Sequence, residues 1–246
     1  MKHLRWQIIL ASILIFLSIV LYFVHYTIFR DAHHIFLYLL GDIAFVPIEV
    51  LLVTVIIHQV LSAREKHARM EKLNMVIGAF FSEVGTKLLT YFSDWDPKLD
   101  NIRKELMVTS DWTQEEFLRM SKRLKKYDYG IDIQRVDLAG LRTFLGAKLD
   151  FLVRLLENPT LLEHESFTNL LWAVFHLAEE LAARGSFTQL PQTDYQHLAG
   201  DIKRIYVLLV HQWLNYMEHL KDNFPYLFSL AMRTNPFDQE ASPVLQ

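Results

Sequence analysis

Two long apolar stretches dominate the first quarter of the chain. Residues 6–29 contain no Asp, Glu, Lys or Arg, and residues 35–61 contain only Asp42 and Glu49 among these four types. At 1.5 Å per residue, a helix over the first stretch is about 36 Å long, which is enough to cross a hydrocarbon core of about 30 Å. A signal-peptide core runs to only about 15 residues and ends at a small-residue cleavage site. The pattern therefore predicts a retained hairpin of two transmembrane helices.

The rest of the chain has the pattern of an α-helical domain. From Ser62 to about Phe92, apolar residues recur at helical spacing, which predicts that the second membrane helix continues out of the bilayer. β-Branched alternation is scarce. Further helices are predicted over residues 110–126 (with Ser110 or Asp111 as the cap), 137–157, 162–184, 194–221 and 224–232.

We therefore expect an all-α fold, in which a transmembrane hairpin precedes a cytosolic helical bundle. Four parts are predicted: the hairpin over residues 1–62, a juxtamembrane helix over 63–93, the bundle over 94–233 and a disordered tail over 234–246. The tail is polar and contains proline, and chain ends of this kind are often poorly ordered.

The short charged flanks indicate an orientation. Lys2 and Arg5 precede the first stretch, four Lys and Arg residues follow the second between positions 64 and 72, and the connection holds Arg30 beside Asp31. Loops rich in Lys and Arg stay on the cytoplasmic side. We therefore expect a multi-pass protein of the cell membrane, with both termini in the cytoplasm and the lipid bilayer as its first partner.

Composition and motifs argue against several classes of function. The 246 residues have a net charge of −3 with dispersed basic residues, so no nucleic-acid partner is expected. The chain has no cysteine, which leaves no disulfide or thiolate chemistry. The sequence has no Gly-rich phosphate loop and no Gly-x-Ser-x-Gly motif. We predict no catalytic residue and no cofactor, and we do not expect an enzyme.

Asp42 and Glu49 are the main functional candidates. They are seven residues apart on nearly the same helical face, and Pro47 between them is expected to kink the helix. A carboxylate at lipid depth costs roughly 2.5–3.5 kcal/mol and needs a partner, water or a proton. Three interpretations stay open: acidic rings that line a cation or proton path, protonated carboxyls that hydrogen-bond between helices, and a re-entrant turn that leaves Asp42 shallow. The first two require a homo-oligomer, because two spans cannot enclose a path.

Histidines form a second group of candidates. His25, His33 and His34 bracket the hairpin, and His58 lies near the inner end of the second span. Imidazoles near a carboxylate relay protons, but they also serve as plain interface residues, which is the interpretation we favour here.

Histidines in the cytosolic part lack the spacing of a known metal motif. Neither Glu-x-x-His nor His-x-x-x-His occurs, so no metal site is predicted. The groups considered were His164 with Glu163 and Glu165, His176 with Glu179 and Glu180, and His211 with Glu218 and His219.

Two glycines on the continuing helix are candidates for helix–helix contact. Gly78 and Gly85 are also seven residues apart and would leave a flat strip that another helix can approach closely. The alternative is that they merely lower helix propensity. If the strip is used, we expect it at a contact between copies of the chain.

The sequence PIEVLLVTVIIHQVLSAREK, followed by EKLNMVIGAFFSEVGTKLL, resembles an uncharacterised family of prokaryotic two-span membrane proteins. The resemblance covers roughly residues 47–89. It implies a membrane hairpin that continues into a cytosolic helix, and it brings no known reaction or catalytic residue.

These observations lead to two functional hypotheses. The first is a non-enzymatic oligomeric scaffold, sensory or regulatory module, in which the cytosolic bundle binds a protein partner while the hairpin localises or senses. The alternative is a small oligomeric cation or proton channel lined by the second transmembrane helix.

Overall fold

The computed structural model describes residues 2–159, 161 and 164–244, and within them it contains helices and turns but no strand. The all-α prediction is therefore confirmed. The helices are α1 (Lys2–Phe29), α2 (Ala32–Phe80), the π-helical turn η1 (Phe81–Gly85), α3 (Thr86–Asp94), η2 (Leu99–Asn101), η3 (Arg103–Leu106), α4 (Gln114–Leu124), η4 (Ile133–Arg135), α5 (Leu138–Leu156), α6 (Glu165–Ala183), α7 (Gln192–Asn223) and α8 (Pro225–Arg233). The chain divides into two compact units, Met1–Lys66 and His67–Gln246, and α2 contributes residues to both.

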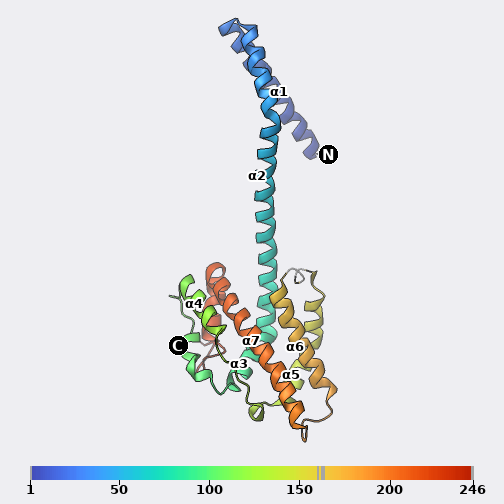
Figure 1. Cartoon of the computed structure of the whole chain (residues 1–246), viewed down its shortest axis with the longest axis vertical. Coiled ribbons are helices and arrows are strands. Elements are labelled where there is room, and N and C mark those ends of the chain that lie inside the picture. The colour runs from blue at the N-terminus through green and yellow to red at the C-terminus, as the bar shows by residue number, and fades with distance from the viewer. Residues whose placement is uncertain (1, 160, 162–163, 245–246) are drawn as a thin grey trace. The chain divides into compact units, whose positions relative to one another are not determined.

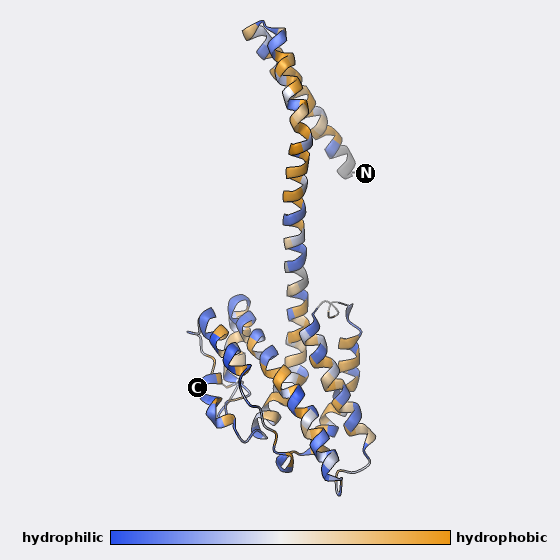
Figure 2. Cartoon of the chain, in the orientation of Figure 1, coloured by the Kyte–Doolittle hydropathy of each residue, from blue (hydrophilic) through white to orange (hydrophobic). Residues whose placement is uncertain are grey.

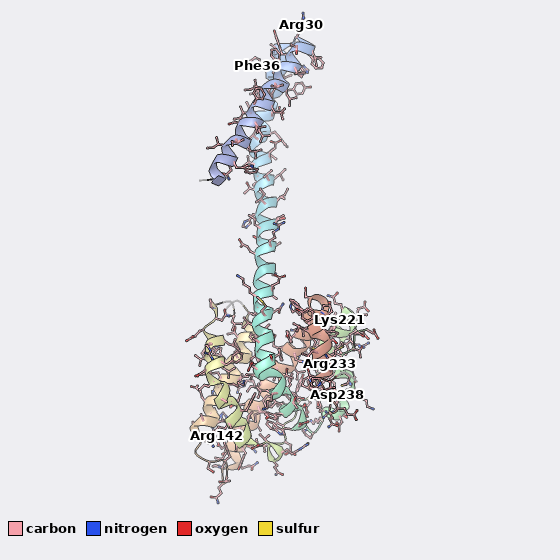
Figure 3. All side chains as sticks on the ribbon, turned by 180° about the vertical axis from the view of Figure 1, so that it is seen from behind. Arg30, Phe36, Arg142, Lys221, Arg233 and Asp238 are labelled. Carbon is pink, nitrogen blue, oxygen red and sulfur yellow. The ribbon has the colours of Figure 1, made fainter. Side chains whose placement is uncertain are left out.

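The first unit is a helical hairpin without a core. α1 and the first part of α2 meet at Arg30, which has a positive φ of 48°, and Asp31 accepts a hydrogen bond of 3.1 Å from the backbone N–H of His34 (Figures 1 and 3). No residue from Trp6 to Lys66 is buried. Large apolar side chains such as Phe36, which is 69% exposed, stand out from the ribbon (Figure 3). Both helices are long and apolar enough to cross a membrane.

Helix α2 continues through the residues at which a kink or a re-entrant turn was considered. Gly41, Asp42 and Pro47 all lie inside α2. The interpretation of a re-entrant turn ending at Asp42 is therefore wrong for this structure. Pro47 removes one backbone hydrogen bond because it has no N–H, yet the helix continues for more than thirty residues beyond it.

The second unit has its own apolar core, and α7 lies at its centre. α7 packs against α3, α4, α6 and α8, while α5 packs on the other side of α6 (Figure 1). Apolar residues of these helices, orange in Figure 2, alternate with polar residues at helical spacing. The largest fully buried side chains include Tyr206, Phe80, Phe92 and Phe167.

The end of α2, the turn η1 and α3 all supply residues to this core, so most of the juxtamembrane helix expected over residues 63–93 belongs to the second unit. Leu73 is 3% exposed, and Phe80, Val84 and Leu88 are each 0% exposed. From Leu73 onward, the apolar stripe predicted over residues 62–92 is therefore part of this core, where Phe81 stacks on Tyr216 of α7. A helix that supplies this much buried surface is part of the folded unit rather than a separate linker.

The expected disordered tail also begins with residues that the core holds. Phe237 is 0% exposed, and its ring lies 5.0 Å from that of Trp213. Asn235 Nδ2 donates a hydrogen bond of 2.9 Å to the carbonyl of Leu106, and Asn235 Oδ1 accepts one of 3.0 Å from the N–H of Phe237. The segment after residue 233 is mostly polar, so its composition did not indicate that Phe237 would be buried in the core.

Helix ends follow local capping chemistry. Asp137, where the sequence predicted the start of a helix, caps α5 and accepts a hydrogen bond of 2.8 Å from the N–H of Gly140. The start of α4 differs from the prediction, because Thr113 rather than Ser110 or Asp111 is the cap. Thr113 forms a capping box with Glu116, which satisfies two backbone N–H groups.

Candidate functional site

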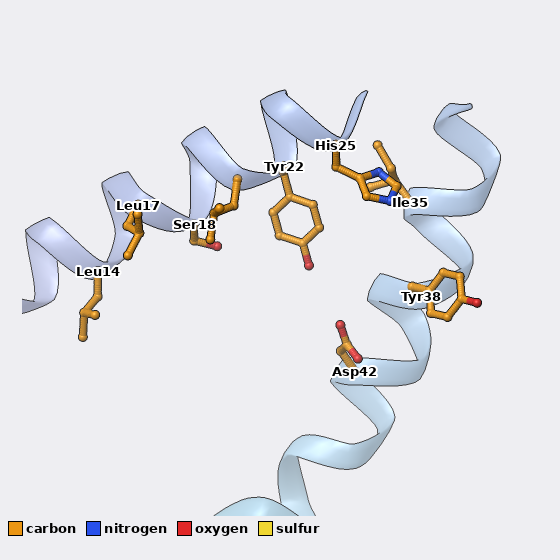
Figure 4. Close-up of a pocket in the computed structure, with 9 residues that line it drawn as sticks. Leu14, Leu17, Ser18, Tyr22, His25, Ile35, Tyr38 and Asp42 are labelled. Carbon is orange, nitrogen blue, oxygen red and sulfur yellow. The ribbon is translucent and has the colours of Figure 1, made fainter. Parts of the chain in front are cut away.

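A cavity of about 470 Å³ lies between the two helices of the first unit. The Tyr22 hydroxyl on α1 and the Asp42 carboxylate on α2 point into the same space (Figure 4). Ser18 and His25 add polar groups from α1, while the rest of the wall is mostly apolar. The lining residues are Leu14, Leu17, Ser18, Leu21, Tyr22, His25, Ile35, Tyr38 and Asp42.

Aromatic rings of both helices lie close together near the hairpin turn. The rings of His25 and His34 are stacked with centroids 6.3 Å apart, and the ring of His34 lies 4.6 Å from that of Tyr38. His25 Nδ1 is buried without a hydrogen-bond partner. Two of the three histidines that bracket the hairpin are therefore packed against each other, one from each helix.

The other membrane candidates do not reach this cavity. Pro47, Glu49 and His58 are exposed residues of α2 and are not among its lining residues. Asp42 and Glu49 share one helix but not one cavity of the single chain. Any shared acidic path would therefore need side chains from further copies.

The two candidate glycines face side chains of their own chain. A Cβ atom at Gly78 would lie 2.9 Å from the Tyr216 hydroxyl on α7, and one at Gly85 would lie 2.7 Å from Phe81 Cδ1. Gly78 thus permits a close approach of α7, and Gly85 makes room for the rings of the π-helical turn. The close approach expected between copies occurs here within one chain.

A second constellation lies on α6 and α7 of the second unit. His176 of α6 and both His197 and Asp201 of α7 place their ligand atoms within 4.8 Å of one another. Asp201 Oδ2 is 3.6 Å from His176 Nε2 and 3.4 Å from His197 Nε2. Both imidazoles are about half exposed, while the Asp201 side chain is 3% exposed. Two half-exposed imidazoles therefore lie next to one buried carboxylate.

The buried carboxylate is satisfied on one oxygen. Asp201 Oδ1 accepts a hydrogen bond of 2.7 Å from Arg204 Nη2. Asp201 Oδ2 is buried and has no hydrogen-bond partner. A buried polar atom without a partner is uncommon and destabilising. A bound cation or a hydrogen-bond donor would therefore stabilise this oxygen.

An ion-pair network borders the same cluster. Glu180 Oε1 lies 3.9 Å from His176 Nε2, and Glu180 Oε2 lies 3.7 Å from His197 Nε2. Arg184 binds Glu180 at 2.6 Å and Asp194 at 2.7 Å. The hydrogen bonds from this guanidinium group hold the pKa of both carboxyls below their usual values. Glu180 is therefore a fixed, ionised neighbour of the two imidazoles.

Sequence reasoning did not find His197 or Asp201. The available signal was a histidine followed four residues later by a carboxylate, which occurs as His176–Glu180 and again as His197–Asp201. Such pairs lie on one face of a helix. The sequence did not show that α6 and α7 would place the two pairs side by side.

The other histidines considered from the sequence have different partners. His211 Nδ1 donates a hydrogen bond of 2.8 Å to the carbonyl of Val207, and His219 Nδ1 accepts one of 3.0 Å from Asn74 Nδ2. His164 Nδ1 lies 3.3 Å from the Ser166 hydroxyl, and Glu163 lies outside the described residues.

Comparison with known proteins gives the same two-part division. Residues 69–233 match the family described as "Uncharacterized protein MJ1433, C-terminal helical domain", and residues 1–61 match that described as "MJ1433, N-terminal helical domain". The chain is 50% identical over 241 residues to the uncharacterized protein MJ1433 of Methanocaldococcus jannaschii, covering 98% of this chain and 97% of that protein. No solved structure matches the chain.

Proposed function

Since the chain belongs to the MJ1433 family, whose description gives two helical domains and no reaction, we propose a function from its own geometry. We propose that it is an integral membrane protein of two spans and a non-enzymatic regulatory or scaffolding module. In this proposal both termini and the second unit are cytoplasmic. The hairpin localises the module, and copies of the chain associate within the membrane.

The contrast between the two units carries the membrane part of this proposal. The exposed large apolar side chains of residues 6–61 are 38–69% exposed, whereas the second unit buries most of its large apolar side chains around α7. Soluble monomers rarely expose contiguous apolar patches larger than a few hundred Å². A lipid environment accepts such side chains at no cost, and a helix satisfies its own backbone there. A bilayer is therefore the partner that best fits the first unit.

A groove between α6 and α7 supports the regulatory part. Trp172 is 55% exposed in this groove, and Lys203 and Arg204 lie along it. Exposed Trp and Arg residues in a concave site are typical centres of protein–protein binding. The groove fits a partner segment that offers an apolar side chain to Trp172 and acidic groups to the basic rim. Its lining residues are Asn169, Trp172, Ala173, His176, Gly200, Lys203, Arg204, Val207 and Leu208.

Site-specific photo-crosslinking tests the partner groove in native membranes. A photoreactive residue at Trp172 is compared with one at Leu118 of α4, which is 56% exposed outside the groove. We expect one recurrent product of defined mass from position 172, lost when Lys203→Glu reverses the charge of the rim. The same product from position 118, or no product from 172, would contradict the partner groove.

The polar cavity of the hairpin favours a second candidate, an oligomeric cation or proton channel. Asp42, Tyr22 and Ser18 offer oxygen atoms at this cavity, and such atoms replace water around a cation or relay a proton. In proteoliposomes, this candidate expects proton or monovalent-cation flux that Asp42→Asn abolishes. Glu49→Gln is the matched control, since Glu49 does not line the cavity.

Absence of flux from an intact wild-type oligomer would eliminate the channel. If both carboxylate variants instead dissociate to monomers in native-mass measurements, a loss of flux reports lost assembly, and the carboxyls are contacts that hold the oligomer together.

A further inference from the structure

We infer that His176, His197 and Asp201 form a binding site for one divalent first-row transition-metal ion of the Zn²⁺ type. The inference concerns the second unit alone and does not depend on the membrane proposal. It rests on the donor set, the spacing of the ligand atoms and an unsatisfied buried carboxylate oxygen.

The spacing of the ligand atoms matches a tetrahedral ion. Metal–ligand bonds of about 2.0–2.1 Å at tetrahedral angles place ligand atoms about 3.3 Å apart. Asp201 Oδ2 lies 3.4 Å from His197 Nε2 and 3.6 Å from His176 Nε2. All three ligand atoms lie within 4.8 Å of one another, and both imidazoles are half exposed, so binding one ion requires the two ring nitrogens to approach each other by at most about 1.5 Å.

The scaffold presents these ligands without any large rearrangement. His197 and Asp201 are four residues apart on α7 and therefore share one helical face. His176 comes from α6, which packs directly on α7. Two helices of the core thus fix the three Cα positions.

Charge around the cluster also favours a cation. This network pairs three carboxylates with two guanidinium groups. The carboxylates are those of Glu180, Asp194 and Asp201, and the guanidinium groups are those of Arg184 and Arg204. One negative charge is left when both imidazoles are neutral, and Asp201 Oδ2 has no hydrogen-bond donor. A bound divalent ion would satisfy this oxygen directly.

Neighbouring groups complete the arrangement expected of a metal centre. Arg204 donates to Asp201 Oδ1 and so orients the opposite oxygen toward the imidazoles. Glu180, held by Arg184, lies on the imidazole side and is placed to accept a hydrogen bond from a metal-bound water or to become the fourth ligand. Three protein ligands and one open position are characteristic of zinc sites that bind water or an exogenous ligand.

The donor set selects the class of ion. Imidazole nitrogens suit Zn²⁺, Fe²⁺, Co²⁺ and Ni²⁺, whereas Mg²⁺ and Ca²⁺ prefer oxygen ligands. We therefore expect Zn²⁺ and Co²⁺ to bind and Mg²⁺ at the same concentration not to compete.

The test uses the full-length protein in detergent, without an affinity tag and stripped of metal by a chelator. Co²⁺ is titrated while its visible absorption is recorded, because the spectrum reports the coordination geometry, and Zn²⁺ is then added as a competitor. We expect one Co²⁺ per chain with a tetrahedral spectrum that Zn²⁺ abolishes. His197→Gln and Asp201→Asn should each weaken binding by more than about 100-fold, since they remove ligands rather than supporting groups.

Matched variants separate this site from general histidine binding. His211→Gln changes another histidine of α7, and Glu179→Gln changes the exposed neighbour of Glu180; both should leave the affinity unchanged. Arg204→Gln should weaken binding by about 10–100-fold, as expected for a group that orients a ligand. His197 is half exposed, so His197→Gln tests the site even if Asp201→Asn fails to fold.

Three outcomes would overturn the inference. They are less than one equivalent bound by the wild type, an octahedral spectrum typical of a surface-bound ion, and equal affinity in wild type and His197→Gln. The last two would mean that the cluster is an ion-pair network in which protonated histidine, and not a metal, faces Asp201.

Discussion

At the scale of single residues, His219 shows how burial and two amide donors restrict one ionisable side chain. Its Nδ1 accepts hydrogen bonds of 3.0 Å from Asn74 Nδ2 and 3.1 Å from Asn223 Nδ2, which requires that this nitrogen carries no proton. Burial lowers the pKa of His219, while the charges of Asp222 and Glu71 act in the opposite direction. The histidine thus joins the end of α2 to α7 in its neutral form.

Acidification should therefore weaken this junction. The unfolded chain binds a proton at His219 near pH 6.5, whereas the folded chain does so only at lower pH. The unfolding free energy should thus fall as the pH drops below about 6.5 and level off below the folded-state pKa. Thermal unfolding between about pH 7.5 and pH 5 should show this loss, and His219→Gln should reduce it. An unchanged slope in His219→Gln, equal to that of the control His58→Gln, would refute this origin.

Only some of the candidate site residues could be predicted from the sequence. Asp42 stood out because a carboxylate in an apolar stretch is costly, and it does line the cavity of the hairpin. His197 and Asp201 did not stand out, because each is an ordinary polar residue of an amphipathic helix. Their proximity to His176 arises from the packing of α6 on α7, which no local pattern encodes.

At the scale of elements, the π-helical turn η1 shows how side-chain volume sets helix geometry. Gly85 ends this turn, and a Cβ atom there would lie 2.7 Å from Phe81 Cδ1 and 2.9 Å from Phe80 Cε1. Both rings are buried, and Phe81 stacks on Tyr216 with centroids 5.2 Å apart. The rings therefore cannot move away at low cost.

Alanine substitutions at Gly85 and at Gly146 should change the unfolding free energy in opposite directions. Gly85→Ala should lower the unfolding free energy by about 1–3 kcal/mol, because overpacking outweighs the gain in helix propensity. A Cβ atom added at Gly146 of α5 would have no neighbouring side chain within 4 Å. Gly146→Ala should therefore raise the unfolding free energy by about 0.5–1 kcal/mol. Denaturant unfolding of both variants checks the sign, and a stabilised Gly85→Ala would contradict the packing of η1.

The elements predicted best were those with a clear local signal. Asp137 and the Asn158–Pro159 pair bracket α5, and its observed bounds are Leu138–Leu156. The start of α4 was misplaced because several Ser, Thr and Asp residues compete as caps near Thr113. The π-helical turn has no periodic signature, since it depends on the volumes of buried rings.

At the scale of the whole molecule, the chain combines a unit without a core and a unit with a complete one. The core of the second unit includes the end of α2, η1 and α3, with Phe80 and Phe92 fully buried. The two compact units therefore meet near residue 67, and most of the helix expected over residues 63–93 belongs to the second unit.

Two fragments should therefore behave differently. A fragment of residues 67–246 should fold and unfold cooperatively, whereas one of residues 94–246 should not, because it lacks these buried side chains. Circular dichroism and thermal unfolding of both fragments distinguish them. Cooperative unfolding of the shorter fragment with equal stability would contradict the boundary.

Membrane topology is the central claim, and single-cysteine labelling tests it most directly, because the natural chain contains no cysteine. His33→Cys places a thiol beside the hairpin turn, and Ser186→Cys places one on an exposed loop of the second unit. With a membrane-impermeant maleimide, we expect intact cells to label His33→Cys and to label Ser186→Cys only after permeabilisation. If His33→Cys is also labelled only after permeabilisation, or if the protein fractionates as soluble, the two-span account is wrong.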